Sequence, residues 1–123
     1  MDLIPDTSVI IEIFGGDKQV LDYLSRYNDK VFGLTAITEF ELFSVELKER
    51  EVIMLDSLPT QEFNKTAGRI GGHIFRDLKR AGKMPRIKDL LIASTCIANH
   101  ERLLTTDRDF EVFKDYGLDI EFI

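Results

Sequence analysis

The fold of this chain is decided by the stretch IKDLLIASTCIANHERLLTTD, which runs from residue 87 to residue 107. Its first part, Ile87–Asn99, is apolar on nearly every side and predicts a buried helix, and Arg102–Thr105 follows as a strand candidate. Asp89 stands in the first turn of the helix, and Asp107 follows the strand by two residues. The stretch therefore predicts a helix that leads into a strand, with one acid at the helix start and another just past the strand.

The same alternation of strand-like and helical patterns covers the rest of the chain. The predicted strands are Leu3–Pro5, Val31–Leu34, Val52–Leu55, Arg102–Thr105 and Ile120–Phe122. The predicted helices are Val9–Phe14, Lys18–Tyr27, Thr35 or Thr38 to Arg50, Pro59 to Gly82, Ile87–Asn99 and Phe110–Lys114. Alternating strands and helices are typical of a parallel sheet covered on both faces. We therefore expect an α/β fold, a three-layer sandwich with a mainly parallel central sheet.

Size and composition indicate one domain, residues 1–123, because 44% of the 123 residues are hydrophobic, enough for a single core. The longest uncharged run, Leu90–His100, is far shorter than the roughly 20 apolar residues that cross a bilayer. The N-terminus has neither a basic nor an apolar signal region, so we expect a cytoplasmic protein with no membrane attachment. The single cysteine, Cys96, has small and apolar neighbours and is predicted to be buried.

Charge is distributed unevenly along the chain. The net charge is −6, but residues 76–88 carry six cationic side chains against Asp77 alone, a local charge of +5. The remainder therefore carries −11. A basic segment on an acidic body is typical either of a solvated helix face or of a surface that binds a polyanion.

Four acids are expected at one edge of the predicted sheet. In a parallel sheet the carboxyl ends of the strands and the amino ends of the following helices collect along the same edge. Asp6 ends the first strand and Asp107 follows a later one, while Glu41 and Asp89 lie in the opening turns of helices. The topology therefore brings these four residues together.

Helical geometry distinguishes Glu41 from its acidic neighbours. At about 100° per residue, Glu41 falls at the margin of the apolar face that Ile37 and Phe40 define. Glu39 and Glu46 point to the opposite side. We therefore expect Glu41, rather than the other two, at the site.

Carboxylates that point into an apolar environment are costly unless they are paired or bound to a cation. Each acid alone has a structural explanation: an N-cap for Asp6, a helix-dipole contact for Asp89 and an ion pair for Glu41. All four together favour a hard divalent ion, Mg²⁺ or Mn²⁺, which takes oxygen ligands. Zinc is disfavoured because His73 and His100 show no ligand-like spacing.

Four short segments, in this order, carry a resemblance to a known family. They are Leu3–Ile10, Thr35–Leu42, Lys88–Ala93 and Leu104–Phe110. With them, the chain resembles the PIN-domain nucleases, in particular the VapC-like toxins of prokaryotic toxin–antitoxin pairs. The resemblance covers nearly the whole length of the chain.

The resemblance implies catalytic and metal-binding acids at Asp6, Glu41, Asp89 and Asp107, with Asp109 as a nearby fifth candidate. It also implies an RNA substrate, a homodimer and an antitoxin protein that blocks the site. The expected reaction is Mg²⁺-dependent hydrolysis of an RNA phosphodiester bond by an activated water.

Further side chains are candidates for supporting roles. Hydroxyl groups beside the acids are expected to position a carboxylate, bind phosphate or cap a helix; they belong to Thr7, Ser8 and Thr105. Four basic side chains are expected to guide the RNA backbone; they are Arg76, Lys79, Arg80 and Lys83.

Two alternatives to a nuclease remain at this stage. The first is a catalytically silent PIN-like module that binds RNA or a protein. The second is a phosphatase or receiver domain, which also gathers acids at a strand edge. An aspartate-nucleophile phosphatase needs a second Asp where Ser8 stands, and a receiver needs an Asp where the strand Val31–Leu34 leads to Thr35. The sequence therefore disfavours this second alternative.

Overall fold

All strands of the protein are short and parallel. The computed structural model describes residues 1–123. Strands β1 (Ile4–Pro5), β4 (Arg102–Thr105) and β5 (Asp119–Phe122) form one sheet in the order β1-β4-β5, and β2 (Leu34–Thr35) pairs with β3 (Thr60–Gln61). A parallel bridge between Leu3 and Phe32 places the second pair beside β1. The strands therefore end along a common edge.

Eight helical segments connect and cover the strands. They are α1 (Thr7–Phe14), α2 (Lys18–Leu24), the 3₁₀ segment η1 (Ser25–Tyr27), α3 (Ala36–Phe43), α4 (Glu49–Asp56), α5 (Lys65–Arg80), α6 (Ile87–Ala98) and the 3₁₀ segment η2 (Arg108–Tyr116). Several helix starts are fixed by side-chain caps: Asp6, Asp17, Thr35 and Asn64 each accept a hydrogen bond from a backbone N–H three residues further on. Two of these caps, Asp6 and Thr35, lie where a strand ends.

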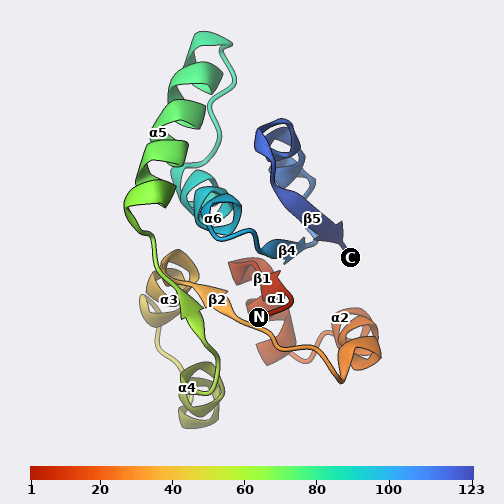
Figure 1. Ribbon diagram of the computed structural model, residues 1–123. Helices are drawn as coiled ribbons and strands as arrows, with labels where there is room; N and C mark the ends of the chain where they lie inside the picture. Colours follow the sequence, from red (N-terminus) through yellow and green to blue (C-terminus); the bar gives the residue numbers. More distant parts are fainter.

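The strands separate two apolar layers. Ile4 and Leu103 pack against α5, α6 and η2, where Phe110 and Phe113 are fully buried. The alternate residues Leu3 and Leu104 pack on the opposite side, against α1 and α2. Figure 1 shows these two helical layers on either side of β4 and β5. The expected α/β fold, with a parallel sheet covered on both faces, is confirmed.

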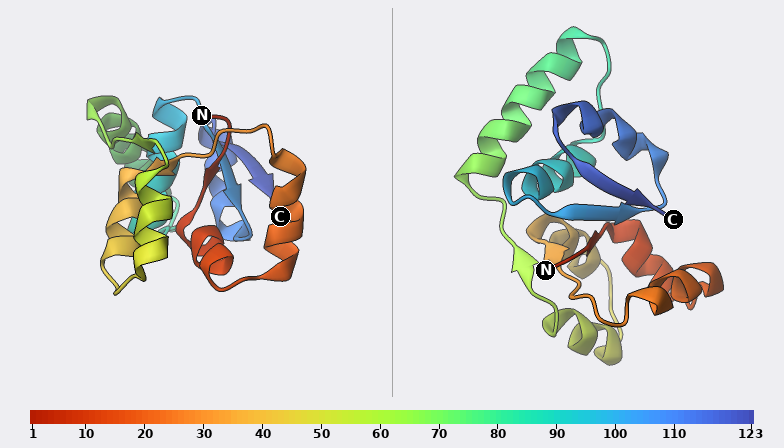
Figure 2. Two further views of the ribbon diagram at one scale, coloured as in Figure 1. Left: turned by 90° about the horizontal axis from the view of Figure 1, so that it is seen from below. Right: turned by 45° about the vertical axis from the view of Figure 1, so that its right-hand side comes forward.

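A third apolar cluster attaches the remaining helices to the sheet. Ile10 of α1, Leu34 of β2, Leu42 of α3 and Leu55 of α4 are all buried in it. Figure 2 shows α3 and α4 beside β2 and β3, on the far side of the molecule from β5. Each fully buried aliphatic side chain of this kind contributes about 1.5–3 kcal/mol, which holds α3, the helix that carries Glu41, against the sheet.

Three expected elements differ from the structure, one in its type and two in their bounds. The run Val52–Leu55 is part of α4 rather than a strand, because the Glu51 side chain accepts the Lys48 backbone N–H at 2.9 Å and starts a helix there. The helix after Thr35 ends at Phe43 and does not reach Arg50. The long helix starts at Lys65, since the residues after Pro59 form β3 and Asn64 supplies the cap.

The packing of α5 on α6 depends on a glycine. A Cβ added to Gly71 would lie 2.9 Å from the Ser94 Oγ and 3.4 Å from the Ser94 Cβ, so a larger residue would force Ser94 or the helices to shift. Cys96 is buried in the same layer, as expected, and burial raises the pKa of its thiol to about 12. The helices are all too short or too polar to cross a lipid bilayer.

Candidate active site

Asp6 is held rigidly at the carboxyl end of β1. Its side chain is only 4% exposed and accepts hydrogen bonds from the Val9 backbone N–H (3.0 Å), the Ser8 hydroxyl (2.9 Å) and the Thr105 hydroxyl (2.7 Å). Burial nevertheless raises the pKa of Asp6, and the charge of Asp107 adds to the rise. The carboxylate is therefore fixed by donors but has no cationic partner.

Thr105, at the end of β4, connects two of the acids. Its buried hydroxyl donates to Asp6 and accepts the backbone N–H of Asp107 at 2.9 Å. Asp107 in turn caps η2 by accepting the Asp109 backbone N–H at 2.9 Å. The strand end thus sets the relative positions of Asp6 and Asp107.

Glu41 reaches the same space from α3. The Thr7 hydroxyl donates to its Oε1 at 2.7 Å, and the Lys88 Nζ lies 4.0 Å from its Oε2. Lys88 also lies over the ring of Phe40, 5.7 Å from its centroid. The Thr7 hydroxyl of α1 and a lysine of α6 therefore hold Glu41 toward the edge of the sheet.

Asp89 is half-buried in the first turn of α6. Burial raises the pKa of its carboxyl; Arg86 opposes this rise, and the charges of Asp107, Asp6 and Glu41 add to it. Each of the other three acids thus lies close enough to disfavour ionisation of Asp89. Repulsion of the Asp89 carboxylate by the other three acids is a property of this site.

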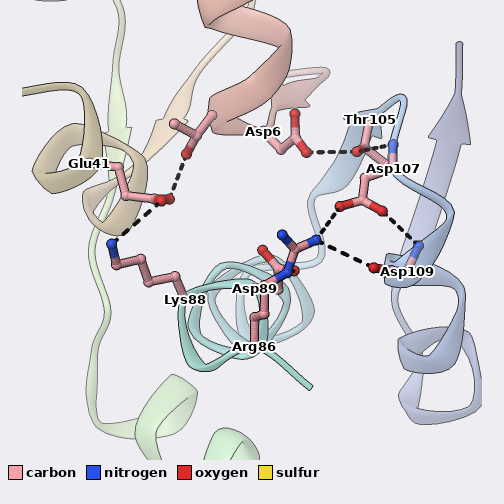
Figure 3. Close-up of polar contacts among 9 residues, drawn as sticks. Asp6, Glu41, Arg86, Lys88, Asp89, Thr105, Asp107 and Asp109 are labelled. Carbon is pink, nitrogen blue, oxygen red and sulfur yellow. Dashed lines mark hydrogen bonds and ion pairs between the residues drawn. The ribbon is translucent and has the colours of Figure 1, made fainter. Parts of the chain in front are cut away.

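The four acids line one cavity of about 220 Å³, which we call the acid pocket. Its other lining residues are Thr7, Ser8, Ile11, Arg86, Ile92 and Phe110. Figure 3 shows carboxylates from separate elements turned toward this space, with Arg86 among them. The guanidinium of Arg86 pairs with Asp89 (3.1 Å), Asp107 (2.8 Å) and Asp109 (3.4 Å).

The donor chemistry of the acid pocket suits a hard divalent cation, because carboxylates and hydroxyls are its polar groups apart from Arg86. No three His, Cys, Asp or Glu side chains in the protein are arranged to hold a metal ion as they stand. Two of the carboxylates, Asp89 and Asp107, are turned to Arg86 instead. The pocket therefore contains the ligand types that a divalent ion prefers. In this structure, however, Asp89 and Asp107 are oriented to pair with the Arg86 guanidinium.

The candidate substrate residues divide into two groups. The hydroxyls of Thr7, Ser8 and Thr105 all donate to site carboxylates. Of the basic candidates, Lys83 lines a second cavity of about 440 Å³ that shares Arg86 and Asp89 with the acid pocket. The others, Arg76, Lys79 and Arg80, belong to the last turns of α5 and line neither of these cavities.

Arg86 and Lys88 are the site residues that the sequence analysis did not single out. Both belong to the basic segment 76–88, and Lys88 also begins the segment Lys88–Ala93, but neither was predicted to contact an acid. The spacing of Arg86, three residues before Asp89, is the signal that could have identified it, since side chains at this spacing meet on one face of a helix. Asp109 is exposed and lies outside the lining of the acid pocket, but pairs with Arg86.

Known proteins share both the sequence and the fold of this chain. Ribonuclease VapC3 of Methanocaldococcus jannaschii is 53% identical over 94 residues, which are 76% of this chain and 97% of that protein. An uncharacterized protein of Archaeoglobus fulgidus is 42% identical over 78 residues, which are 63% of this chain and 90% of that protein.

Solved structures show the same fold at lower identity. VapBC2 from Rickettsia felis, bound to a promoter DNA fragment, has a chain with a TM-score of 0.79 and 22% identity, covering 99% of this chain and 98% of its own. VapBC-1 from nontypeable Haemophilus influenzae gives a TM-score of 0.78 and 20% identity, with the same coverage of both chains. The PIN domain model matches residues 3–116, a span that contains all four acids of the pocket, and the chain belongs to the PIN-domain family.

Proposed function

We propose that the protein is a Mg²⁺- or Mn²⁺-dependent endoribonuclease that hydrolyses RNA phosphodiester bonds, and that it is the toxin of a toxin–antitoxin pair. The observation that carries this proposal is the convergence of Asp6, Glu41, Asp89 and Asp107 from four elements on one cavity. The 53% identity to a protein named Ribonuclease VapC3 supports the choice of RNA over other phosphodiesters.

The proposed ligands of the ion are the four acids of the pocket, with Asp109 beside them as a fifth candidate. A bound divalent ion would supply an activated water and compensate charge on the phosphate. The protein's own contribution is position: Thr105, Ser8 and the Val9 N–H fix Asp6, and Thr7 fixes Glu41. Carboxylates held in this way lose little conformational freedom when they bind a cation.

The RNA backbone is proposed to approach along the second cavity. Lys83 lines that cavity, which shares the lining residues Arg86 and Asp89 with the acid pocket. Arg76, Lys79 and Arg80 lie on the preceding turns of α5 and are proposed to guide the RNA toward this cavity. These cations would attract a polyanion to the otherwise acidic molecule.

The proposed partners are an antitoxin protein and a second copy of the chain, with the protein acting in the cytoplasm. The two solved structures described above carry the name VapBC, and a third of similar fold, from Mycobacterium tuberculosis, belongs to the VapBC family of toxin–antitoxin systems. Exposed apolar side chains near the pocket support a protein partner: Ile11 lines the pocket, and Phe40 and Phe43 lie on α3 beside Glu41.

Cleavage of a panel of RNAs tests the proposal. The wild type is expected to cleave at least one RNA in Mg²⁺ and to stop when EDTA is added. Asp6→Asn and Glu41→Gln should each slow cleavage by more than about 100-fold, because even residues that only support metal ligands contribute about 10- to 100-fold. Circular dichroism checks that both variants remain folded.

Glu39→Gln is the matched control. Glu39 stands two residues before Glu41 on α3 but contacts Thr60 instead of the pocket, so cleavage should stay at the wild-type rate. Folded Asp6→Asn and Glu41→Gln proteins that cleave normally would contradict the mechanism. Binding of RNA without cleavage in any divalent ion would identify the silent module instead.

A further inference from the structure

We propose that Arg86 is the resident counter-ion of the acid pocket, that a metal ion must displace it from Asp89 and Asp107, and that the displaced guanidinium then binds the RNA phosphate. This inference rests on the proposed function. It assigns to one side chain both a control of metal affinity and a contact with the substrate.

The contacts of Arg86 are those of a cation that fills the pocket. Its Nε lies 3.1 Å from the Asp89 Oδ2, and its Nη2 lies 2.8 Å from the Asp107 Oδ2. The same Nη2 lies 3.4 Å from the Asp109 Oδ2. Figure 3 shows the guanidinium surrounded by these three acids. One planar group therefore compensates carboxylates of α6 and of the segment after β4.

No other cation of the protein pairs with Asp89 or Asp107. Lys88 lies on the far side of the pocket, 4.0 Å from Glu41 and over the ring of Phe40. Asp6 has hydrogen-bond donors but no basic partner. Arg86 is therefore the cation that offsets the repulsion among Asp89, Asp107 and their acidic neighbours.

A metal ion and Arg86 compete for the same atoms. The Oδ2 of Asp89 and the Oδ2 of Asp107 both contact the guanidinium, so a metal ion that takes these atoms as ligands must compete with Arg86 for them. A doubly charged ion placed beside an arginine would also be repelled. Removal of Arg86 must therefore favour metal binding.

Displacement of Arg86 is structurally easy. Its side chain is 68% exposed, and the residue precedes α6 without forming a side-chain cap. Ion pairs of exposed side chains are weak, so a dication at millimolar concentration can break them. The acids that it pairs with are themselves partly or largely exposed.

The second cavity gives the displaced guanidinium a destination. Arg86 lines this cavity as well as the acid pocket, together with Lys83, Met84 and Val112. Rotation away from Asp107 into this cavity, which Lys83 also lines, would turn its N–H donors toward the proposed path of the RNA. Arginine binds phosphate through two parallel hydrogen bonds, which suits this position.

Titration calorimetry with Mg²⁺ and Mn²⁺ alone, without RNA, tests the first half of the inference. Arg86→Ala should bind either ion about fivefold more tightly than the wild type, because the competitor and its repulsion are gone. Arg86→Gln, which keeps hydrogen-bonding capacity without the charge, should behave in the same way. If Arg86 merely positioned the acids, both variants would bind the ions more weakly.

Arg102→Ala is the matched control. Arg102 also pairs with two acids, Asp119 at 3.0 Å and Glu121 at 3.7 Å, but none of these residues lines the acid pocket. Metal affinity should not change in this variant. A similar gain in Arg102→Ala would assign the effect to net charge and overturn the inference.

RNA cleavage at saturating metal tests the second half. Arg86→Ala should raise the KM for RNA about tenfold, since a bidentate phosphate contact is lost. Arg86→Ala is therefore expected to change the two affinities in opposite directions: the protein should bind the metal more tightly and the RNA more weakly. If the wild type binds metal and cleaves RNA, but a folded Arg86→Ala protein binds metal no more tightly than the wild type, the inference about Arg86 is wrong and the proposed function stands. A wild type that bound no metal would instead refute the proposed function.

Discussion

Two clusters of acids in this protein have opposite electrostatic character. At the β5 edge, Glu121 accepts hydrogen bonds from the hydroxyls of Tyr23 and Tyr27 and pairs with Arg102, which also pairs with Asp119. We call these residues the Glu121 cluster. Burial opposes ionisation of Glu121, but the two hydroxyls and Arg102 outweigh it and lower its pKa. In the acid pocket, burial and neighbouring acids raise the pKa of Asp6 and Asp89.

The opposite pKa shifts distinguish acids whose charge stabilises the fold from acids whose charge is disfavoured unless a cation binds. In the Glu121 cluster, two hydroxyl donors and a cation surround Glu121, so folding favours the charged form of this carboxyl. In the acid pocket, carboxylates outnumber the cations, and folding brings together groups that repel one another. Such an arrangement persists when other interactions stabilise the fold, and it is typical of functional sites.

The largest expected effect comes from removing the hydroxyl that fixes Asp6. Thr105→Val preserves the shape of the buried side chain but leaves Asp6 without its 2.7 Å donor and the Asp107 N–H without an acceptor. Loss of a group that orients a ligand typically weakens metal affinity by about 10- to 100-fold. Calorimetric titration with Mn²⁺ measures this effect.

Two substitutions sharpen that result. Thr105→Ser retains the hydroxyl and should keep metal affinity within about threefold of the wild type. Tyr27→Phe removes a hydroxyl from the Glu121 cluster and should leave metal affinity unchanged, since Tyr27 lines no part of the acid pocket. If Thr105→Val bound metal as tightly as Thr105→Ser, the hydroxyl would have no role in the site.

An intermediate effect is expected in the Glu121 cluster, on stability. Glu121→Gln should lower the free energy of unfolding at neutral pH by about 1–2 kcal/mol, because a carboxylate that accepts two hydroxyls is replaced by a neutral amide. The pKa of Glu121 is lowered, so its contribution is present above the ordinary value of 4.5 and is lost as the pH falls through the folded-state pKa.

Urea unfolding at several pH values checks this prediction. The wild type should lose more stability than Glu121→Gln between neutral pH and the acid range below 4.5. Parallel pH curves for the two proteins would show that the Glu121 cluster does not favour the charged carboxylate.

The acid pocket could be predicted from sequence because each acid follows from a local rule. Asp6 and Asp107 follow strands, and Asp89 stands in the first turn of a helix that is apolar almost throughout. The helical phase separates Glu41, which lines the pocket, from Glu39, which contacts Thr60. These placements depend only on periodicity and on the direction of the chain.

Features that depend on long side chains or very short elements could not be predicted in this way. The ion pairs of Arg86 with Asp107 and Asp109 span more than twenty residues and depend on rotamers. Strand β3 has only two residues, too few to show the alternation of apolar and polar side chains that identifies a strand. A helix beginning at Pro59 was therefore predicted across it. The run Val52–Leu55 was ambiguous, since a short apolar run fits a strand as well as a buried helix turn.

The smallest expected effect tests the repulsion itself. Asp89→Asn should raise the free energy of unfolding of the metal-free protein at neutral pH by less than about 1 kcal/mol, because relief of burial and repulsion is partly offset by the lost pair with Arg86. The folded-state pKa of Asp89 is raised, so the wild type is relatively most stable below the ordinary value of 3.8 and loses this advantage as the pH rises through the folded-state pKa.

Melting curves with and without Mg²⁺ separate this repulsion from a general effect of charge. Mg²⁺ should raise the melting temperature of the wild type more than that of Asp89→Asn, since the ion stabilises only the folded site that retains its ligands. Asp119→Asn, a neutralisation in the Glu121 cluster, should lower metal-free stability and leave the response to Mg²⁺ intact, because Asp119 is paired with Arg102. Equal responses to Mg²⁺ in the wild type and Asp89→Asn would mean that Asp89 does not share a cation with the other acids, and the contrast between the two clusters would then lie in their burial alone.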